Sequence, residues 1–186
     1  MIIGRFQALS LYSGAGGLDL GMEAAGFRVG SAVESDGDCV ETLRANRGWP
    51  VFPDYIQEVP CESLLEASSR APEEPDLLFG GPPCQPFSKC GYWATGDSAR
   101  LDDPRADTVE AFLRVLRDTR PRAFLMENVT GMGYSGKDEG LRLIRRALDD
   151  INRDYGTAYG VEVLILNAAD FGVPQTRERV FLIGSR

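Results

Sequence analysis

The sequence has no histidine, which excludes the catalytic devices that depend on an imidazole. Ser-His-Asp triads, Cys-His dyads and histidine-ligated zinc sites are therefore ruled out at once. The four cysteines include no C-x-x-C pair, so zinc ribbons and thioredoxin-type redox motifs are not expected, and we predict no metal site. A disulfide framework is not expected at this cysteine density, which favours a reducing, intracellular compartment.

Lysine and long apolar runs are the other scarce features. Only Lys89 and Lys137 are lysines among 20 basic residues, and 28 acidic residues bring the formal net charge to −8. A chain this acidic lacks the broadly basic surface that would grip nucleic acid alone. No segment has the length of a transmembrane helix, and the N-terminus lacks the apolar stretch of a signal peptide. These absences predict a cytoplasmic protein with no membrane partner.

The chain has 186 residues, enough for one domain with a buried core, and we expect a single domain over residues 1–186. Apolar runs with strand-like spacing alternate with runs of helical spacing. The expected strands are 6–12, 27–33, 51–52, 76–79, 123–126, 161–166 and 179–183, and the expected helices are 18–25, 36–46, 62–70, 105–120 and 139–153. This alternation predicts an α/β fold with a doubly wound, Rossmann-like, mostly parallel sheet whose last two strands are antiparallel.

A glycine-rich turn, residues 13–17, follows the first expected strand. Glycines let the backbone turn sharply and approach a ligand, and the next helix offers free N–H groups. Glu34 ends the second strand, where a carboxylate can bind both hydroxyls of a ribose. This pairing indicates NAD, FAD or S-adenosylmethionine, although an ordinary strand-helix turn is the alternative. The G-x-G-G form is not the dinucleotide fingerprint, so a pyrophosphate cofactor is less favoured.

Three prolines surround Cys84 in the segment GGPPCQPFS, residues 80–88. They restrict the backbone and would hold the thiol in a rigid, presented loop, which a nucleophile needs and a buried structural cysteine does not. Because no histidine is available as a base, backbone dipoles or arginines would have to lower the pKa of this thiol. We therefore predict that Cys84 is a nucleophile, whereas Cys39, Cys61 and Cys90 are expected to be structural.

Charged side chains follow two later strands. Glu127 comes after the apolar strand 123–126, where it could donate a proton; a capping or ion-paired glutamate is the alternative. Arg177 and Arg179 stand at the start of the last expected strand, and alternation along that strand places them on one face. Two adjacent guanidiniums would bind an anionic or carbonyl partner, or else form a solvated, salt-bridged edge.

Together these segments resemble the DNA (cytosine-5) methyltransferases over nearly the whole chain. The matching segments are YSGAGGL at 12–18, Glu34, GPPCQPFS at 81–88, ENV at 127–129 and QTRER at 175–179. The resemblance implies an S-adenosylmethionine-dependent methyltransferase fold with S-adenosylmethionine as the cofactor. The implied cofactor contacts are Tyr12, Ser13, Gly14, Gly16, Gly17, Leu18, Glu34, Ser35, Asp54, Tyr55 and Pro83. Family members often contact adenine through an Asp-Ile pair, and here either Asp54 or Tyr55 occupies that position.

The resemblance also implies a mechanism on double-stranded DNA. The target cytosine is flipped out of the duplex. Cys84 attacks C6 of the ring, and Glu127 binds N3. Arg179 holds the cytosine through O2, while Arg177 supports the loop or a phosphate. The implied catalytic residues are thus Cys84, Glu127, Arg177 and Arg179, and no metal takes part.

The family continues beyond its Gln-x-Arg-x-Arg strand into a target-recognition region and two further motifs. The sequence ends before them, so we expect a second polypeptide to carry the target-recognition region and the remaining motifs. The resemblance further implies a role in restriction-modification and association with the nucleoid when the protein is bound to DNA. A catalytically silent remnant that acts as a binding or assembly module, and the same chemistry on RNA, are the alternatives.

Overall fold

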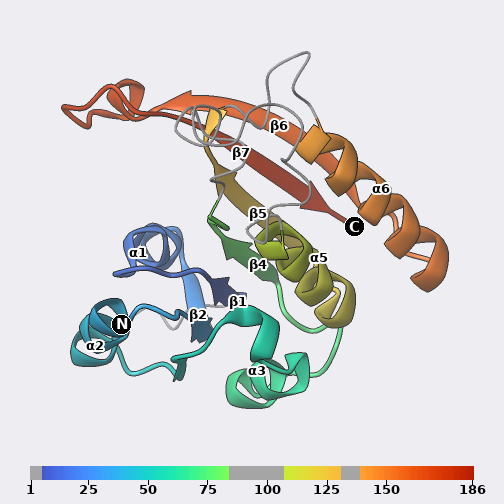
Figure 1. The fold of residues 1–186 in the computed structure, drawn as a ribbon, viewed down its shortest axis with the longest axis horizontal. Coiled ribbons are helices and arrows are strands. Elements are labelled where there is room, and N and C mark those ends of the chain that lie inside the picture. The colour runs from blue at the N-terminus through green and yellow to red at the C-terminus, as the bar shows by residue number, and fades with distance from the viewer. Residues whose placement is uncertain (1–5, 84–106, 131–138) are drawn as a thin grey trace. The chain divides into compact units, whose positions relative to one another are not determined.

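The computed structural model describes residues 6–83, 107–130 and 139–186 (Figure 1). Its strands are β1 (Phe6–Leu11), β2 (Phe27–Val33), β3 (Val51–Phe52), β4 (Leu77–Gly80), β5 (Ala123–Asn128), β6 (Gly160–Asn167) and β7 (Glu178–Ser185). Its α-helices are α1 (Gly17–Ala24), α2 (Gly37–Asn46), α3 (Cys61–Ser68), α5 (Asp107–Thr119) and α6 (Glu139–Tyr155). Two short 3₁₀ helices, η1 (Ile56–Glu58) and η4 (Ala168–Phe171), complete the described elements.

The strands form one seven-stranded sheet in the order β3-β2-β1-β4-β5-β7-β6. Strand β1 pairs in parallel with β2 and β4, and β2 pairs in parallel with β3. The last two strands, β6 and β7, pair antiparallel. The predicted mixed α/β fold with a mostly parallel sheet and an antiparallel C-terminal pair is therefore confirmed.

The chain divides into two compact units, which are described separately. The first unit comprises residues up to Gly81 together with Arg114–Phe124, and the second comprises Pro82–Leu113 and Leu125–Arg186. The glycine turn and Glu34 fall in the first unit, whereas Glu127, Arg177 and Arg179 fall in the second. Each unit thus carries one part of the predicted site.

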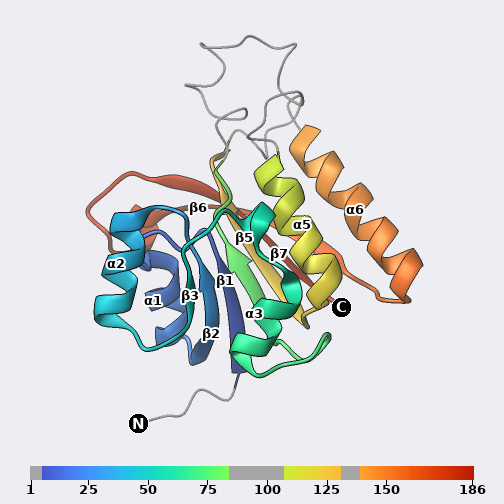
Figure 2. The same ribbon diagram turned by 60° about the horizontal axis from the view of Figure 1, so that its bottom comes forward.

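In the first unit, α1 and α3 lie on opposite sides of β1 and β2 (Figures 1 and 2). Every residue of β1 after Phe6 is buried, as a strand covered on both faces requires. Gly30 of β2 permits the close approach of α3, because a Cβ there would lie 2.7 Å from Cβ of Ser68. Strands β1, β2, β3 and β4 are parallel, so their carboxyl ends lie at the same edge of the sheet. The predicted cofactor-binding segments of this unit follow β1, β2 and β3.

The second unit contains the β6–β7 hairpin and α6. Ile144, Leu148 and Ile151 form the buried stripe of α6, with the spacing of an amphipathic helix. Strand β7 alternates between more and less exposed positions, and Val180 and Leu182 are buried. The hairpin pairs continuously from Gly160 opposite Ser185 to Asn167 opposite Glu178. Its connection, residues 168–177, contains the first three residues of the QTRER segment at 175–179, and the last two belong to β7.

The predicted strands and helices all occur, with shifted ends. Glu127 and Asn128 are the last residues of β5 rather than residues that follow it. Arg177 lies before β7, which begins at Glu178, so the prediction that Arg177 and Arg179 alternate within one strand is wrong. The physical reason is that hydrogen bonds hold Arg177 in the connection. The Asn167 side chain accepts the N–H of Arg177 at 3.2 Å, and the Arg177 carbonyl accepts the N–H of Ala168.

Candidate active site

The glycine turn after β1 has the backbone conformations that its sequence predicts. Gly14 has a φ of 55° and Gly16 a φ of 88°, in the left-handed region where glycine is not strained. A Cβ on Gly16 would also lie 3.0 Å from Cδ2 of Leu43. Gly17 and Leu18 then begin α1, and the first amides of a helix have no acceptor within it. The turn therefore presents backbone N–H groups at the end of β1.

Glu34 is bound directly to this turn. Its Oε2 accepts the N–H of Gly14 at 2.6 Å, and its Oε1 accepts the N–H of Asp36 at 2.8 Å. An ionised carboxylate has about four acceptor sites, so a half-buried Glu34 keeps capacity for further donors. Ser35, the next residue, is exposed. This arrangement fits a ribose whose two hydroxyls donate to Glu34 beside the glycine turn.

Tyr12 and Ser13 connect β1 to the turn. The Ser13 hydroxyl lies 2.7 Å from the hydroxyl of Ser10, and both side chains are buried. Tyr12 has a φ of 56°, which is uncommon for a tyrosine and marks the start of the tight turn. Burial raises the pKa of Tyr12, and the nearby Arg114 partly offsets this effect. The phenol is therefore neutral at physiological pH.

Asp19, a residue that the sequence analysis did not single out, lies completely buried in the first turn of α1. Neither carboxylate oxygen has a hydrogen-bond partner within the described residues. Burial raises the pKa of Asp19, and the charge of Arg47 acts in the opposite direction. An acidic residue in a first helical turn usually signals an exposed, dipole-stabilised position, so nothing in the local sequence distinguished this buried one.

Asp54 and Tyr55 follow β3 and are both exposed; 65% of the Tyr55 surface is accessible. The Tyr55 carbonyl accepts the N–H of Glu58 at 2.8 Å and so joins this segment to η1. The structure therefore places both candidates for adenine contact in an accessible loop of the first unit, and the choice between them stays open.

Cys84 lies outside the described residues, which stop at Pro83 on this side. The backbone before it is tethered within the second unit. Asn128 donates from Nδ2 to the Pro82 carbonyl at 3.2 Å, and Thr108 donates from its hydroxyl to the Pro83 carbonyl at 2.9 Å. Pro82 is buried and Pro83 is exposed. Two polar side chains therefore hold the two peptide units that precede the predicted nucleophile.

Glu127 and Arg179 form an ion pair in the second unit. Arg179 Nε lies 3.0 Å from Glu127 Oε1, and about a quarter of each side chain is exposed. Arg179 also donates from Nη1 to the Glu178 carbonyl at 2.7 Å. The structure thus brings together two of the predicted catalytic residues. Arg177 does not join them in the strand: it lies exposed in the preceding connection.

Asn128 and Asn167 end strands β5 and β6, and neither has a role predicted from the sequence. Asn128 is 2% exposed, and its Oδ1 accepts the N–H of Val129 while its Nδ2 holds Pro82. Asn167 Oδ1 accepts the N–H groups of Ala169 and Arg177, which closes the β6–β7 connection. An asparagine at the end of an apolar strand is the signal that could have identified both residues.

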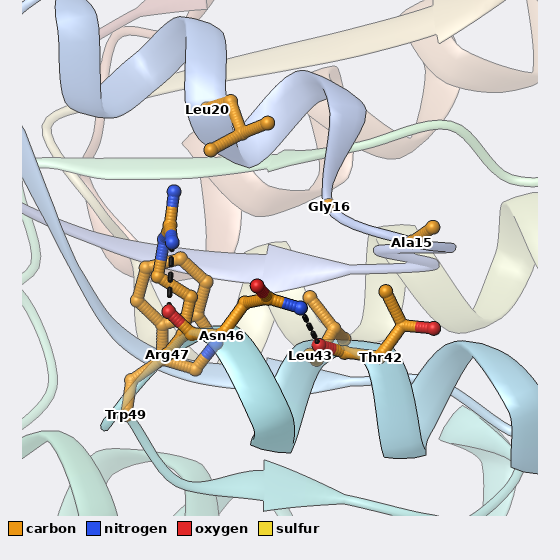
Figure 3. A pocket seen from close by; sticks show the side chains of 8 residues that line it. All are labelled: Ala15, Gly16, Leu20, Thr42, Leu43, Asn46, Arg47 and Trp49. Atoms are coloured by element: carbon orange, nitrogen blue, oxygen red, sulfur yellow. Dashed lines mark hydrogen bonds between the residues drawn. The ribbon is translucent and has the colours of Figure 1, made fainter.

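A pocket of about 210 Å³ lies beside the glycine turn, against α1 and α2 (Figure 3). Its lining residues are Ala15, Gly16, Leu20, Thr42, Leu43, Asn46, Arg47 and Trp49. The Arg47 guanidinium lies 5.7 Å from the centre of the Trp49 ring and also pairs with Glu23. Of the predicted cofactor contacts only Gly16 lines this pocket, so it is distinct from the surface formed by Gly14 and Glu34.

A family model described as C-5 cytosine-specific DNA methylase matches residues 6–186. The chain belongs to this family. Type II methyltransferase M.AquIA of Picosynechococcus sp. is 45% identical over 183 residues, which cover 97% of this chain and 72% of that relative. Type II methyltransferase M.SacI of Streptomyces achromogenes is 36% identical, with coverage of 98% of this chain and 48% of the relative.

Solved structures agree with this family assignment. A crystal structure from E. coli, described as a DNA modification methyltransferase encoded within a prophage, superposes with a TM-score of 0.74 at 28% identity. The match covers 98% of this chain and 47% of that one. The chain therefore spans about half the length of M.SacI and of this structure, and nearly three quarters of M.AquIA.

Family membership confirms the predictions of a methyltransferase of the cytosine-5 type and of S-adenosylmethionine as its cofactor. The Type II methyltransferases among the relatives also confirm the link to restriction-modification. Within the described ranges, no helix is both long and apolar enough to span a bilayer. The same residues contain no cluster of three or more His, Cys, Asp or Glu side chains that could hold a metal ion.

Proposed function

We propose that this chain transfers a methyl group from S-adenosylmethionine to C5 of a cytosine flipped out of double-stranded DNA, through a covalent Cys84 adduct. The Glu127–Arg179 ion pair is the observation that carries the proposal, because it joins a carboxylate and a guanidinium beside the tethered backbone that leads to Cys84. A cytosine presents a ring nitrogen and a carbonyl oxygen on adjacent positions. One carboxylate and one guanidinium match these two groups.

Both partners of the ion pair keep groups for a substrate. Glu127 uses Oε1 for Arg179, and Arg179 uses Nε for Glu127 and Nη1 for the Glu178 carbonyl. Glu127 Oε2 and Arg179 Nη2 take part in neither of these two contacts. In the proposed complex, Glu127 holds a proton at N3 and Arg179 donates to O2, while their mutual contact fixes the relative position of the two side chains. Arg177, in the connection, would support the loop or a phosphate.

The proposed role of Cys84 follows from the electronics of the ring, since C5 of cytosine is a poor nucleophile. The Cys84 thiolate forms a bond to C6, the ring becomes protonated at N3 beside Glu127, and C5 acquires enamine character. When bound, S-adenosylmethionine would supply the electrophilic methyl group that C5 takes, and S-adenosylhomocysteine would be the leaving group. A base then takes the C5 proton, the electrons of that C–H bond restore the C5–C6 double bond, and the C6–S bond breaks to release the thiolate. The proton on N3 returns to Glu127, which leaves a neutral 5-methylcytosine.

The cofactor would be held in the first unit by the glycine turn and Glu34. The Gly14–Glu34 hydrogen bond supports this assignment, because it sets the carboxylate against the backbone that would contact the ligand. Tyr12, Ser13, Gly16, Gly17 and Leu18 would contribute from the turn, and Ser35, Asp54 and Tyr55 from the segments after β2 and β3. Pro83 falls in the second unit, and its contact with the cofactor stays a prediction from the sequence.

Trapping on 5-fluorocytosine DNA tests the covalent step, because fluorine at C5 cannot leave as a proton. The chain is tested together with the target-recognition region of a relative supplied on a second polypeptide. We expect an adduct that survives denaturation with the wild-type chain and none with Cys84→Ser, although Cys84→Ser should still bind S-adenosylmethionine. An adduct in the Cys84→Ser protein would contradict the assignment. Cofactor binding without transfer to DNA or RNA would instead favour a binding or assembly module.

We also propose that DNA recognition requires a second polypeptide. The net charge of −8 supplies little phosphate neutralisation. Four large apolar side chains of the second unit are well exposed and support a protein interface there: Ile165 (46%), Phe171 (68%), Val173 (46%) and Ile183 (39%). Nucleoid association would follow from DNA binding by the assembled enzyme.

Co-expression tests this second proposal. Methylation of host DNA should appear only when a polypeptide carrying a target-recognition region is present, and an oligonucleotide of RNA should not be modified. Sequence-specific methylation of DNA by the purified 186-residue chain alone would overturn it, and transfer to RNA alone would favour the RNA alternative.

A further inference from the structure

Arg114 of α5 binds the segment that follows the predicted adenine contacts. Its Nη2 donates to the carbonyl of Ile56 at 2.6 Å and to that of Val59 at 3.2 Å. Its Nη1 lies 3.1 Å from Sγ of Cys61, the first residue of α3. All of these residues belong to the first unit. One guanidinium therefore ties together η1, the residue after it and the start of α3.

The thiol of Cys61 completes this arrangement. Cys61 is 3% exposed, and its Sγ also lies 3.3 Å from Oδ2 of Asp118, one turn further along α5. Burial raises the pKa of Cys61 to about 12, so the thiol stays protonated and donates to Asp118 while it accepts from Arg114. Arg114 is thus oriented by a neutral partner and directs its other donors at the two carbonyls.

The clamped segment determines where Asp54 and Tyr55 lie. Ile56 and Val59 are buried, whereas Asp54 and Tyr55 immediately before them are exposed. The Tyr55 carbonyl accepts the N–H of Glu58, so the position of η1 fixes the end of the exposed loop. No side chain caps the N-terminal end of η1. At its C-terminal end, the guanidinium of Arg114 binds the carbonyls of Ile56 and Val59 and so anchors the turn that follows this loop.

Arg114 also acts on the glycine turn. Its charge lies near enough to the Tyr12 phenol to counter part of the rise in the pKa of Tyr12 that burial causes. Tyr12 follows β1 and begins the turn that leads to Gly14. Asp54 and Tyr55 follow β3, which is separated from β1 in the sheet by β2. Arg114 thus binds the segment that follows Asp54 and Tyr55 and also acts electrostatically on Tyr12.

We propose that Arg114 is a positioning residue that sets the adenine side of the cofactor site, by holding in place the loop of Asp54 and Tyr55. This inference rests on the proposed cofactor site. The planar fork of arginine reaches two carbonyls and a thiol at once, which the single ammonium of lysine cannot do. Loss of the fork would free the adenine-side loop and leave Glu34 and its ribose contacts in place.

Selectivity for adenine measures this role more directly than affinity does. The test compares the binding of S-adenosylhomocysteine with that of S-inosylhomocysteine, in which an oxo group replaces the exocyclic amine. A site that hydrogen-bonds an N–H group rejects the analogue that lacks it. For the wild-type chain we expect a preference of about tenfold or more for the adenine compound. In Arg114→Met and Arg114→Lys this preference should fall at least threefold.

Two controls separate positioning from general stability. Arg117→Met changes an exposed arginine of the same helix and should leave the preference unchanged. Cys61→Ala removes a buried contact and should lower the melting temperature, yet it keeps the two carbonyl bonds and should preserve most of the selectivity. If Arg114→Met does not fold, Arg114→Lys decides the question, since it keeps a positive charge and most of the side-chain volume.

The possible outcomes are distinct. A fall in adenine selectivity in the Arg114 variants, with both controls selective, supports the proposal. An unchanged ratio, whether or not both affinities fall, overturns it. Failure of the wild-type chain to bind S-adenosylhomocysteine under any condition would instead contradict the proposed cofactor site, so the two failures are distinguishable.

Discussion

The amide of Gly14 donates a hydrogen bond of 2.6 Å to Oε2 of Glu34, which joins the glycine turn after β1 to the end of β2. The two residues are the backbone element and the carboxylate of the predicted cofactor site. Their direct contact means that each sets the position of the other. Glu34 is therefore both a candidate ligand of ribose and the residue that holds the turn in place.

This relationship predicts a large effect of Glu34→Ala on cofactor affinity. The substitution removes charge-assisted hydrogen bonds to ribose and also the acceptor of the Gly14 amide, so binding of S-adenosylmethionine should weaken by about 1.5–3 kcal/mol in calorimetry. Glu34→Gln should be intermediate, because it keeps one acceptor oxygen. Glu41→Ala, which removes an exposed carboxylate of α2, should bind like the wild type. Equal affinities in all four proteins would contradict the assignment.

Arg179→Lys should reduce turnover far more than Arg177→Lys does. Arg179 is paired with Glu127, whereas Arg177 is exposed in the connection before β7. Lysine at position 179 cannot bind Glu127 and the cytosine carbonyl in the same fork geometry, so we expect kcat to fall roughly 10²-fold or more. Lysine at position 177 should mainly raise KM for DNA. Single-turnover kinetics with the complementing polypeptide measures both, and a larger loss of kcat at position 177 would reverse the assigned roles.

Asn128→Ala should impair catalysis through the backbone before Cys84. The substitution leaves the buried Pro82 carbonyl without its donor and the Val129 amide without its acceptor, so the free energy of unfolding should fall by about 1–3 kcal/mol. The yield of 5-fluorocytosine adduct should fall as well, since the segment leading to the nucleophile is no longer tethered. Asn46→Ala is the matched control, because that amide makes a similar bond to Thr42 on an exposed surface. A wild-type rate of adduct formation in Asn128→Ala would show that the tether is purely structural.

Asp19→Asn should stabilise the fold at neutral pH. Burial raises the pKa of Asp19 in the native state above its ordinary value of 3.8, which applies to the unfolded state. At a pH between the unfolded-state and the native-state pKa, the native state therefore binds more protons than the unfolded state. Its contribution to stability therefore falls as pH rises through that window. Replacing the buried carboxylate by a neutral amide removes this cost, which we expect to amount to roughly 1–3 kcal/mol at pH 7.

Thermal unfolding of the Asp19→Asn protein as a function of pH provides the measurement. The gain in melting temperature should be present at pH 7 and should shrink as the pH falls through the raised pKa of the native carboxyl, because the wild-type carboxylate then becomes neutral. A gain of the same size at neutral and at acidic pH would mean that packing, and not charge, causes the effect. Asp38→Asn, at an exposed position in the first turn of α2, is the control and should show no gain at pH 7.

Local chain chemistry determined much of this protein by itself. The glycines of residues 14–17 imply a turn with positive φ values. Asp36 is a typical N-cap residue at the start of the expected helix 36–46, and its side chain accepts the N–H of Cys39 at 2.9 Å. The alternation of apolar runs predicts each strand and α-helix of the described residues, although not the two short 3₁₀ helices. These features depend on backbone sterics and on periods of 2 and 3.6 residues, which act over a few positions in the sequence.

The partnerships between distant residues were decided only by the tertiary structure. Asn128 and Pro82 are 46 positions apart, and Arg114 and Ile56 are 58 apart. Which side chain meets which backbone depends on the order of strands in the sheet and on the exact residue at which β5 ends and β7 begins. No periodicity specifies these, because long-range pairing is selected by the packing of the whole sheet and not by the preferences of each segment.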